Sequence, residues 1–324
     1  MKAVRIHQFG DESVLKYEDA PEPQPKAGEV LVKAGAVSMN RADLGRRAGT
    51  ARGAAGAAPV FPMALGLDGA GTIEALGEGV TDRSVGQRVA FFGPSYAEYT
   101  ALPAASTVGI PASLPFEAAA CVPVVFMTAW NGLRGVLKSG ETALVQAGGS
   151  GVGTAAIQVA KYTGAKVLAT AGSDEKCQKC LDLGADVAIN YSTQDFVAEA
   201  RKATEGRGVD FVLESVGGDV YTKSLEAMAS GGRLVSIGRS AGPVPEVEQK
   251  FLEEHGITAT PFGVGAMRTE SPQEFMAGME MVLMFIDMGI FKVVIDRTFP
   301  LSEAAEAHRY LAGRKNFGKV VLAP

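Results

Sequence analysis

Four glycines lie close together in the run Ala147-Gly-Gly-Ser-Gly-Val-Gly153. Glycine has no Cβ atom, so the chain can turn tightly there and its backbone N–H groups can come close to a ligand. A segment with the hydrophobic period of a helix, 151–163, follows at once. The free N–H groups at a helix N-terminus favour an anion. These residues therefore predict a turn that binds phosphate.

Apolar runs that predict β-strands flank this turn on both sides. Thr142–Gln146 precedes the glycines, and Lys166–Ala171 follows the helical segment. A strand, a Gly-rich turn, a helix and a second strand within about 30 residues is the context in which such a turn binds the pyrophosphate of a dinucleotide. The spacing is a variant of the strict G-x-G-x-x-G pattern, and the alternative interpretation is a glycine-rich turn that holds no ligand.

The composition favours a globular protein with two domains. The chain has 324 residues, of which 47% are hydrophobic and 21% charged, and its formal net charge is −5. A net negative charge argues against nucleic-acid binding, which requires a basic face. No apolar run approaches the ~20 residues of a membrane span, the best candidate being 279–294. The first residues lack the apolar core of a signal peptide, so we expect a cytoplasmic protein with no membrane or nucleic-acid partner.

The first 120 residues are rich in predicted strands, with glycines and prolines at the bends. Strands at this density suggest a small, partly closed barrel. Asn40–Arg47 predicts one short helix, and the Ala/Gly-rich segment 48–59 predicts a mobile surface loop.

Strands and helices alternate from 142 onward, after a helical stretch at 116–137. After the strand at 142–146, strands are predicted at 167–171 (the run already described), 187–189, 209–214, 233–237 and 257–262, with helices at 175–183, 195–203 and 220–228. This pattern predicts a doubly wound sheet of about six strands. A helix at 273–288, a strand at 291–296, a helix at 303–312 and a strand at 320–322 follow. We expect this tail to pack on the N-terminal β domain.

Residues that bind catalytic zinc are scarce. The three histidines lie far apart in the sequence, and no cysteine precedes Cys121. Cys177-Gln-Lys-Cys180 supplies only half of a zinc site, and a redox pair would need a thioredoxin-like setting. The sequence therefore predicts no metal site, and the two cysteines are interpreted as small residues of a helix.

Several longer phrases resemble one family of oxidoreductases. They include VSMNRADLGRRAG, GLDGAGTIEALGEGVTDRSVGQRV, FEAAACVPVVFMTAWNGL, LGADVAINY and GRGVDFVLESVGGD, and with the glycine-rich stretch they span nearly the whole chain. The chain resembles the zinc-independent quinone oxidoreductase, or zeta-crystallin-like, branch of the medium-chain dehydrogenase/reductase superfamily. The resemblance implies an α/β protein that combines a GroES-like, partly closed β-barrel domain with a doubly wound Rossmann domain.

The resemblance also implies how the chain is divided. Residues 1–123 would form the first part of the GroES-like catalytic domain, 124–264 the NADP-binding Rossmann domain, and 265–324 a segment that returns to complete the catalytic domain. It implies a homodimer in which the last Rossmann strand, about 257–262, pairs across a two-fold axis. Zinc-dependent members of the superfamily carry Gly-His-Glu where this chain has Gly66-Leu67-Asp68.

NADPH is the cofactor that the sequence favours. A Rossmann domain that prefers NAD usually ends its second strand in an acid that binds the ribose 2′-OH, whereas this strand ends Thr170-Ala-Gly-Ser173. By resemblance, Lys176, Tyr191 and Arg314 bind the 2′-phosphate, although each taken alone is equally well a solvated surface residue. The other cofactor-binding residues predicted are Ser150, Gly151, Val152, Gly153, Ser173, Ser215, Gly238, Phe262 and Val264.

For the reaction, the resemblance implies metal-free hydride transfer to a conjugated carbonyl compound. It places Asn40 at the nicotinamide and substrate, with Asp43 and Thr128 nearby, and the alternative roles are a helix cap or polar packing. No tyrosine follows the helix at 40–47, so we expect the proton to come from solvent and not from a tyrosine such as Tyr96.

The predicted function is NADPH-dependent reduction of quinones. One alternative is a reductase of 2-alkenals, enones or enoyl thioesters on the same fold. Another is a crystallin-like protein that binds NADPH without turnover.

Overall fold

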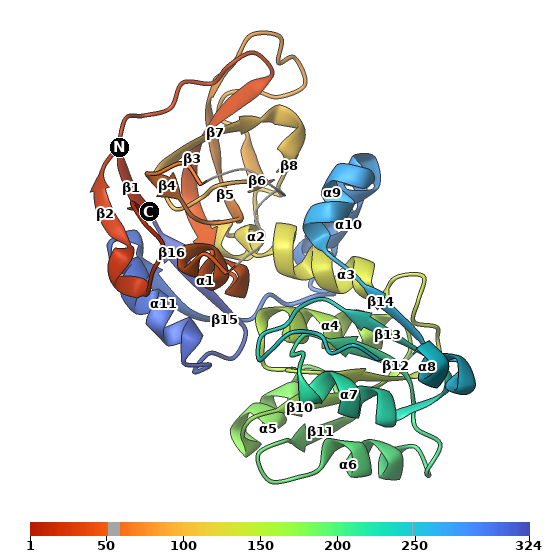
Figure 1. Ribbon diagram of the computed structural model, residues 1–324. Coiled ribbons are helices and arrows are strands. Elements are labelled where there is room, and N and C mark those ends of the chain that lie inside the picture. Colours follow the sequence, from red (N-terminus) through yellow and green to blue (C-terminus); the bar gives the residue numbers. More distant parts are fainter. Residues whose placement is uncertain (51–58, 248) are drawn as a thin grey trace. The chain divides into compact units, whose positions relative to one another are not determined.

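The computed structural model describes residues 1–50, 59–247 and 249–324 (Figure 1). The chain divides into two compact units. Met1–Val124 together with Gln273–Pro324 forms the first, called here the barrel unit, and Val125–Pro272 forms the second, called the Rossmann unit. Most of the loop predicted at 48–59 lies outside the described residues.

A parallel sheet forms the centre of the Rossmann unit, and in the described residues its strand order is β11-β10-β9-β12-β13-β14 (Figure 1). The strands are β9 (Thr142–Val145), β10 (Lys166–Ala171), β11 (Val187–Asn190), β12 (Val209–Glu214), β13 (Met228–Ser236) and β14 (Thr258–Pro261). The chain therefore starts in the middle of the sheet, winds outward to one edge, and then returns to wind outward to the other. This confirms the predicted doubly wound fold, in which ligands bind at the carboxyl ends of the strands.

Helices surround this sheet. The helices of the Rossmann unit are α3 (Met127–Leu133), α4 (Gly151–Tyr162), α5 (Asp174–Asp182), α6 (Phe196–Ala203), α7 (Asp219–Glu226), α8 (Gln249–His255) and α9 (Val264–Glu270). Of these, α9 contacts α3. On one face, Phe196 of α6 and Leu225 of α7 pack with Leu144 of the central strand in a buried cluster. Helices α4, α5, α6 and α7 match the predicted segments to within a few residues, whereas α8 and α9 were not predicted.

The helix predicted over 116–137 is divided in the structure. It consists of α2 (Phe116–Ala120), a π-helical turn (Val122–Phe126) and α3. Pro123 has no backbone N–H group, so a regular α-helix cannot continue through it. Within the described residues, Phe116–Leu133 is also the helical run that is long and apolar enough to cross a membrane, in place of 279–294, and 78% of that run is buried inside the protein, as in a core helix.

The barrel unit is built on two sheets. Within the described residues their orders are β15-β16-β3-β5-β6-β8, with β7 also paired to β3, and β2-β1-β4. The strands are β1 (Lys2–Ile6), β2 (Lys16–Asp19), β3 (Glu29–Ser38), β4 (Met63–Ala64), β5 (Asp68–Leu76), β6 (Arg88–Phe92), β7 (Tyr99–Pro103), β8 (Thr107–Gly109), β15 (Ile295–Pro300) and β16 (Lys319–Ala323). Besides α2, its helices are α1 (Arg41–Ala48), α10 (Pro272–Asp287) and α11 (Ala304–Ala312).

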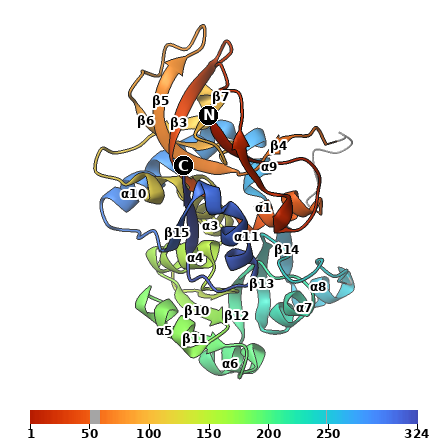
Figure 2. The same cartoon turned by 90° about the vertical axis from the view of Figure 1, so that its left-hand side faces the viewer.

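The C-terminal segment completes the larger of these sheets. β16 pairs antiparallel with β3, with Val321 opposite Ser38, and α11 lies beside β15 (Figure 2). The prediction of a strand at 291–296 was displaced by four residues, because β15 spans Ile295–Pro300 and pairs in parallel with β16. The tail therefore returns to the N-terminal β domain, as expected, through the backbone hydrogen bonds between β16 and β3.

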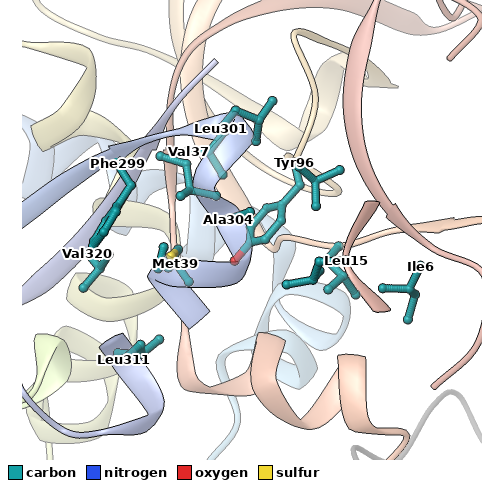
Figure 3. Close-up of a cluster of buried hydrophobic side chains, with 14 residues drawn as sticks. Ile6, Leu15, Val37, Met39, Tyr96, Phe299, Leu301, Ala304, Leu311 and Val320 are labelled. Atoms are coloured by element: carbon teal, nitrogen blue, oxygen red, sulfur yellow. The ribbon is translucent and has the colours of Figure 1, made fainter. Parts of the chain in front are cut away.

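Apolar side chains from both parts of the chain fill one core of the barrel unit. Figure 3 shows Ile6, Val37 and Tyr96 of the N-terminal part packed with Phe299 and Leu301 of the C-terminal part. All five side chains are at most 5% exposed. Burial of this kind stabilises a fold by about 25 cal/mol per Å² of apolar surface, so the two parts of the chain hold each other in place.

Candidate functional site

The glycine-rich turn of the Rossmann unit is fixed by hydrogen bonds to β10. The Ala147 N–H group donates to Thr170 Oγ1 (3.1 Å) and the Gly148 N–H group to the Thr170 carbonyl oxygen (2.7 Å). Ser150 is the N-cap of α4, and its Oγ accepts the Gly153 N–H group at 2.9 Å. In this turn the left-handed backbone belongs to Ala147, with φ 53°, and not to a glycine.

Gly153 is required for close packing of the helix on the turn. A Cβ atom at this position would lie 2.3 Å from the Ala147 carbonyl oxygen and 2.7 Å from Gly148 Cα. Real Cβ contacts are not this short, and both neighbours are backbone atoms that cannot rotate away. The last glycine of the motif therefore lets α4 start directly over the end of β9.

Every strand of the Rossmann sheet is followed by a residue predicted to bind the cofactor. Because the strands are parallel, their carboxyl ends meet at one edge of the sheet. In strand order β9 to β14, the residues at this edge are Ser150, Ser173, Tyr191, Ser215, Gly238 and Phe262. Gly151, Val152 and Gly153 form the first turn of α4, and Val264 begins α9. The topology thus gathers these residues at the sheet edge where doubly wound folds bind nucleotides.

Tyr191 reaches back over the tip of β10. A Cβ atom at Gly172 would lie 2.6 Å from Tyr191 Oη, so the phenol group covers this glycine. Ser173 is the N-cap of α5, and its Oγ accepts the Lys176 N–H group at 3.3 Å. Tyr191, Ser173 and Lys176 thus come from one short stretch of the sheet edge.

The two carboxylates that follow Ser173 are already engaged. Asp174 Oδ1 accepts a hydrogen bond from Asn190 Nδ2 at 2.7 Å, and Glu175 Oε1 pairs with Lys179 Nζ at 2.7 Å. The hydrogen bond and charge of Lys179 hold the pKa of Glu175 below its usual value. Both acids therefore have partners within the Rossmann unit other than a ribose hydroxyl.

Arg314 belongs to the barrel unit, just after α11. Its backbone has φ 54°, and its N–H group donates to the Leu311 carbonyl oxygen at 3.2 Å. The same oxygen accepts a hydrogen bond from Arg41 Nη2 at 3.3 Å. A second guanidinium group is therefore present at the turn that carries Arg314.

Asn40 and Asp43 lie together at the start of α1. Asn40 is the N-cap residue, and its backbone N–H group donates to Asp43 Oδ2 at 2.8 Å. Asp43 is fully buried and Asn40 is 5% exposed. Asp43 therefore acts as a helix cap, the alternative role considered above. Thr128, the third predicted catalytic residue, lies on α3 in the Rossmann unit.

Two further residues surround the Asn40 side chain, and sequence reasoning did not assign them to the site. Asn40 Nδ2 donates to Asp68 Oδ1 (2.7 Å) and to the Ser38 carbonyl oxygen (3.3 Å), while Asn40 Oδ1 accepts from Lys319 Nζ (2.9 Å). Lys319 also donates to the Met39 carbonyl oxygen, and Asp68 Oδ2 accepts the Val124 N–H group at 3.1 Å. Asp68 stands where zinc-dependent relatives carry Glu, which was its only signal in the sequence.

Burial controls the charge of these carboxyl groups. Desolvation raises the pKa of Asp68 to about 7, against the opposing effect of the Lys319 charge. Desolvation likewise raises the pKa of Asp43 to about 6. Both groups therefore titrate close to neutral pH, well above the usual range of an aspartate.

We expect the protein to become more stable as the pH falls from 8 to 6. Asp68 and Asp43 have folded-state pKa values of about 7 and about 6, above the unfolded value, so their contribution is fully present at low pH and is lost as the pH rises through these values. The gain is about 1–2 kcal/mol over this interval. Urea unfolding at pH 8, 7 and 6 measures it, and Asp68→Asn should flatten the dependence. A stability that is constant in wild type would contradict the assignment.

Tyr96 lies in the core of the barrel unit and is fully buried (Figure 3). Its Oη is 3.2 Å from His308 Nε2, and Arg47 Nη1 is 3.1 Å from His308 Nδ1. Because arginine only donates, His308 Nδ1 must accept, and the proton of the neutral ring lies on Nε2 and faces the tyrosine. Burial lowers the pKa of His308 to about 3. Tyr96 therefore has a packing and hydrogen-bonding role in the core of the barrel unit.

The remaining candidate ligands do not form a metal cluster. In the part of the chain that the structure describes, no three His, Cys, Asp or Glu side chains are grouped as metal ligands. Cys177 and Cys180 are free thiols buried on α5, and burial raises the pKa of Cys180 to about 12. A thiol with this pKa is protonated at neutral pH, which agrees with the packing role inferred for the pair.

Two family models match the chain, the first within the barrel unit and the second mostly within the Rossmann unit. Residues 26–112 match the alcohol dehydrogenase GroES-like domain, and residues 151–282 match a model described as zinc-binding dehydrogenase. The second description refers to zinc. At the Gly-His-Glu motif of zinc-dependent relatives, however, this chain has Leu67 in place of the histidine and Asp68 in place of the glutamate.

Similar proteins cover the whole chain. A quinone oxidoreductase from Pseudomonas aeruginosa is 34% identical over 100% of this chain and 99% of its own length. A 2-haloacrylate reductase from a Burkholderia species is 30% identical over 99% of this chain and 98% of its own. Among solved structures, Escherichia coli quinone oxidoreductase complexed with NADPH superposes with a TM-score of 0.93 at 29% identity, covering 100% of both chains.

Proposed function

This chain belongs to the zinc-independent quinone oxidoreductase branch of the medium-chain dehydrogenase/reductase superfamily, and on that premise we propose that it is an NADPH-dependent reductase that transfers a hydride to quinones without a metal. The observation that supports NADPH as the cofactor is the arrangement at the tip of β10. Ser173, Lys176 and Tyr191 come together there, and the nearby carboxylates have partners on other side chains. A 2′-phosphate would meet donors and a cation there, while the side chains of Asp174 and Glu175 are held by Asn190 and Lys179. Arg314 is the fourth residue proposed to bind it.

Lys176→Ala and Arg314→Ala are expected to raise the Michaelis constant for NADPH by tenfold or more and to leave that for NADH nearly unchanged. Each lost charge-assisted hydrogen bond to phosphate costs about 1.5–3 kcal/mol, and NADH has no 2′-phosphate to lose it. Steady-state kinetics with both cofactors measures the effect. Lys202→Ala on α6 of the same unit removes an exposed lysine that pairs with Glu199 and serves as the matched control. Equal effects on both cofactors would contradict the proposal.

The chemistry that NADPH supplies when bound is hydride donation to an electrophilic carbon. Quinones accept a hydride without a Lewis acid because the negative charge spreads onto a carbonyl oxygen. The task left to Asn40, with Asp43 and Thr128 in support, is to hold the reacting groups in place and keep them dry. We propose that the proton comes from solvent, and the burial of Tyr96 against His308 supports this.

A panel of acceptors tests the reaction itself. We expect NADPH oxidation with 1,4-benzoquinone or 9,10-phenanthrenequinone. The similarity to a 2-haloacrylate reductase supports a second candidate, reduction of a conjugated C=C bond in 2-alkenals, enones or enoyl thioesters. Turnover of enals alone would favour that candidate. Tight NADPH binding with no turnover on any acceptor would favour the third candidate, a non-catalytic crystallin-like protein.

We also propose that the protein is a cytoplasmic homodimer joined through the last Rossmann strand. β14 lies at an edge of the sheet, and three of its four residues are exposed. An exposed strand edge offers unpaired backbone groups to a second copy of the chain. Sedimentation equilibrium should give twice the mass of 33.6 kDa. An Ala259→Pro variant, in which the lost N–H group faces the free edge and not β13, should sediment as a monomer, and a wild-type monomer would contradict the proposal.

A further inference from the structure

The side-chain amide of Asn40 has only one orientation that satisfies its neighbours. The Lys319 ammonium group can only donate a hydrogen bond, so the Asn40 atom 2.9 Å away must be the oxygen. The Ser38 carbonyl oxygen can only accept, so the atom facing it must be the nitrogen. The contact with Asp68 Oδ1 at 2.7 Å agrees with this assignment. Three neighbours on different parts of the chain thus impose the same orientation.

Sheet register brings these neighbours together. β16, β3 and β5 are adjacent strands, with Val321 opposite Ser38 and Ser38 opposite Asp68. Lys319 is 4% exposed and Asp68 fully buried. Both side chains therefore approach Asn40 from ordered backbone, which is the arrangement required to hold a group to within a fraction of an ångström.

These contacts use nearly all the hydrogen-bonding capacity of the amide. Both hydrogens of Asn40 Nδ2 have acceptors, and one lone pair of Oδ1 is taken by Lys319. Oδ1 also faces the Asp43 N–H group in the capping box at the start of α1, so within the described residues the amide has no donor hydrogen left and can meet a ligand only through Oδ1. A ligand that meets this side chain must offer a hydrogen, such as an amide N–H or a hydroxyl group.

We propose that Lys319 and Asp68 are positioning residues that hold the Asn40 amide in this orientation, so that Asn40 contacts the bound reactants only as a hydrogen-bond acceptor. The inference rests on the proposed function, which puts Asn40 at the nicotinamide and substrate. It assigns the stabilisation of a developing oxyanion to a group other than Asn40. It also makes the first residue of β16 part of the machinery that starts at α1.

The charged groups around Asp68 set its pKa, and this pKa gives a measurable test of the arrangement. Lys319 on β16 and Asp43 on α1 act on its carboxylate, and Arg46 on α1 acts on Asp43. Tyr96 and Cys121 also face the cluster, and burial raises the pKa of both thiol and phenol so far that they stay neutral at pH 7, Cys121 at about 12. Because Lys319 opposes the rise of the Asp68 pKa, its removal should raise that pKa further.

The amide can be observed without any turnover. The chain has four asparagines, Asn40, Asn131, Asn190 and Asn316, so protein labelled with [15N]asparagine gives four side-chain amide signals. We expect the Asn40 pair, identified by its loss in Asn40→Ser, to shift with a midpoint near pH 7 as Asp68 ionises. In Lys319→Met the midpoint should rise by about one pH unit or more. Lys161→Met, which removes a lysine paired with Asp186 in the Rossmann unit, should leave it unchanged.

An Asn40 signal that does not titrate, or that titrates identically in Lys319→Met, overturns the proposal. If Lys319→Met does not fold, Asp68→Asn gives the same reading, because the pH-dependent shift should then disappear. The kinetic arm uses the acceptor panel. Lys319→Met should lower kcat by about 10- to 100-fold, the usual effect of a misplaced reacting group, with a smaller change in KM. Lys319→Arg, which keeps the donor and the charge, should recover part of this loss.

The two hypotheses fail in different ways. If none of the acceptors in the panel supports NADPH oxidation by the wild-type protein, the proposed function is contradicted. The amide titration still decides the orientation of Asn40 in that case. An active wild type whose Lys319→Met variant keeps its kcat, after correction for the folded fraction, contradicts the positioning role alone. A purely structural role for Lys319 would lower the thermal midpoint and leave the pH dependence of kcat in place.

Discussion

Replacement of Gly153 by alanine is expected to weaken NADPH binding by roughly 100-fold, or about 3 kcal/mol. The added Cβ atom would lie 2.3 Å from the Ala147 carbonyl oxygen and 2.7 Å from Gly148 Cα, so the turn or the start of α4 must move. Either movement displaces the N–H groups that are proposed to face the pyrophosphate. Overpacking of this kind also lowers the free energy of unfolding by about 1–3 kcal/mol. Fluorescence titration with NADPH and urea unfolding measure the two effects.

Gly265 provides the matched control. It lies in α9 of the same unit, and a Cβ atom there would meet nothing within 4 Å. Gly265→Ala should change the free energy of unfolding by less than about 1 kcal/mol and leave NADPH affinity unchanged. If Gly153→Ala binds NADPH as tightly as this control does, the turn is not the pyrophosphate site.

Leu322→Ala is expected to lower the free energy of unfolding by about 2–5 kcal/mol. Leu322 is fully buried in the core shown in Figure 3 and lies opposite Val37 in the pairing of β16 with β3. The truncation leaves a cavity that the surrounding strands cannot fill without moving. Met284→Ala on α10, where the side chain is 49% exposed, should cost less than about 0.5 kcal/mol. Equal stabilities of the two variants in urea would show that β16 contributes little to the core.

The Rossmann unit was predictable from the sequence because its signals are local. Each strand is a short apolar run, each of α4, α5 and α6 begins at an N-cap whose side chain accepts a backbone N–H group, and the glycine-rich turn joins the first strand to the first helix. The segment of α8 lacked such signals, and the interruption at Val122–Phe126 depends on how one proline is accommodated. Family resemblance supplied what periodicity does not, namely the return of the tail to the first sheet.

The charged surroundings of Asn40 were not predictable in the same way. Asp68 and Lys319 are separated by most of the chain and become neighbours only through the register of β5, β3 and β16. A lysine near the end of a sequence gives no local sign that it is 4% exposed. Long-range pairing of this kind is a tertiary property. Hydrophobic periodicity of 2 or 3.6 residues predicts strands and helices but not which strands pair.

The position of β16 in the larger sheet has a consequence for how the protein is made. This strand lies between β15 and β3, yet it follows the whole Rossmann unit in the sequence and therefore leaves the ribosome after it. Domains generally fold as units during synthesis, so the Rossmann unit has all its strands while β3 still lacks its neighbour. Until Lys319 emerges, Asp68 and Asp43 remain without their buried cation. The barrel unit can thus complete its larger sheet only after the whole Rossmann unit has been synthesised.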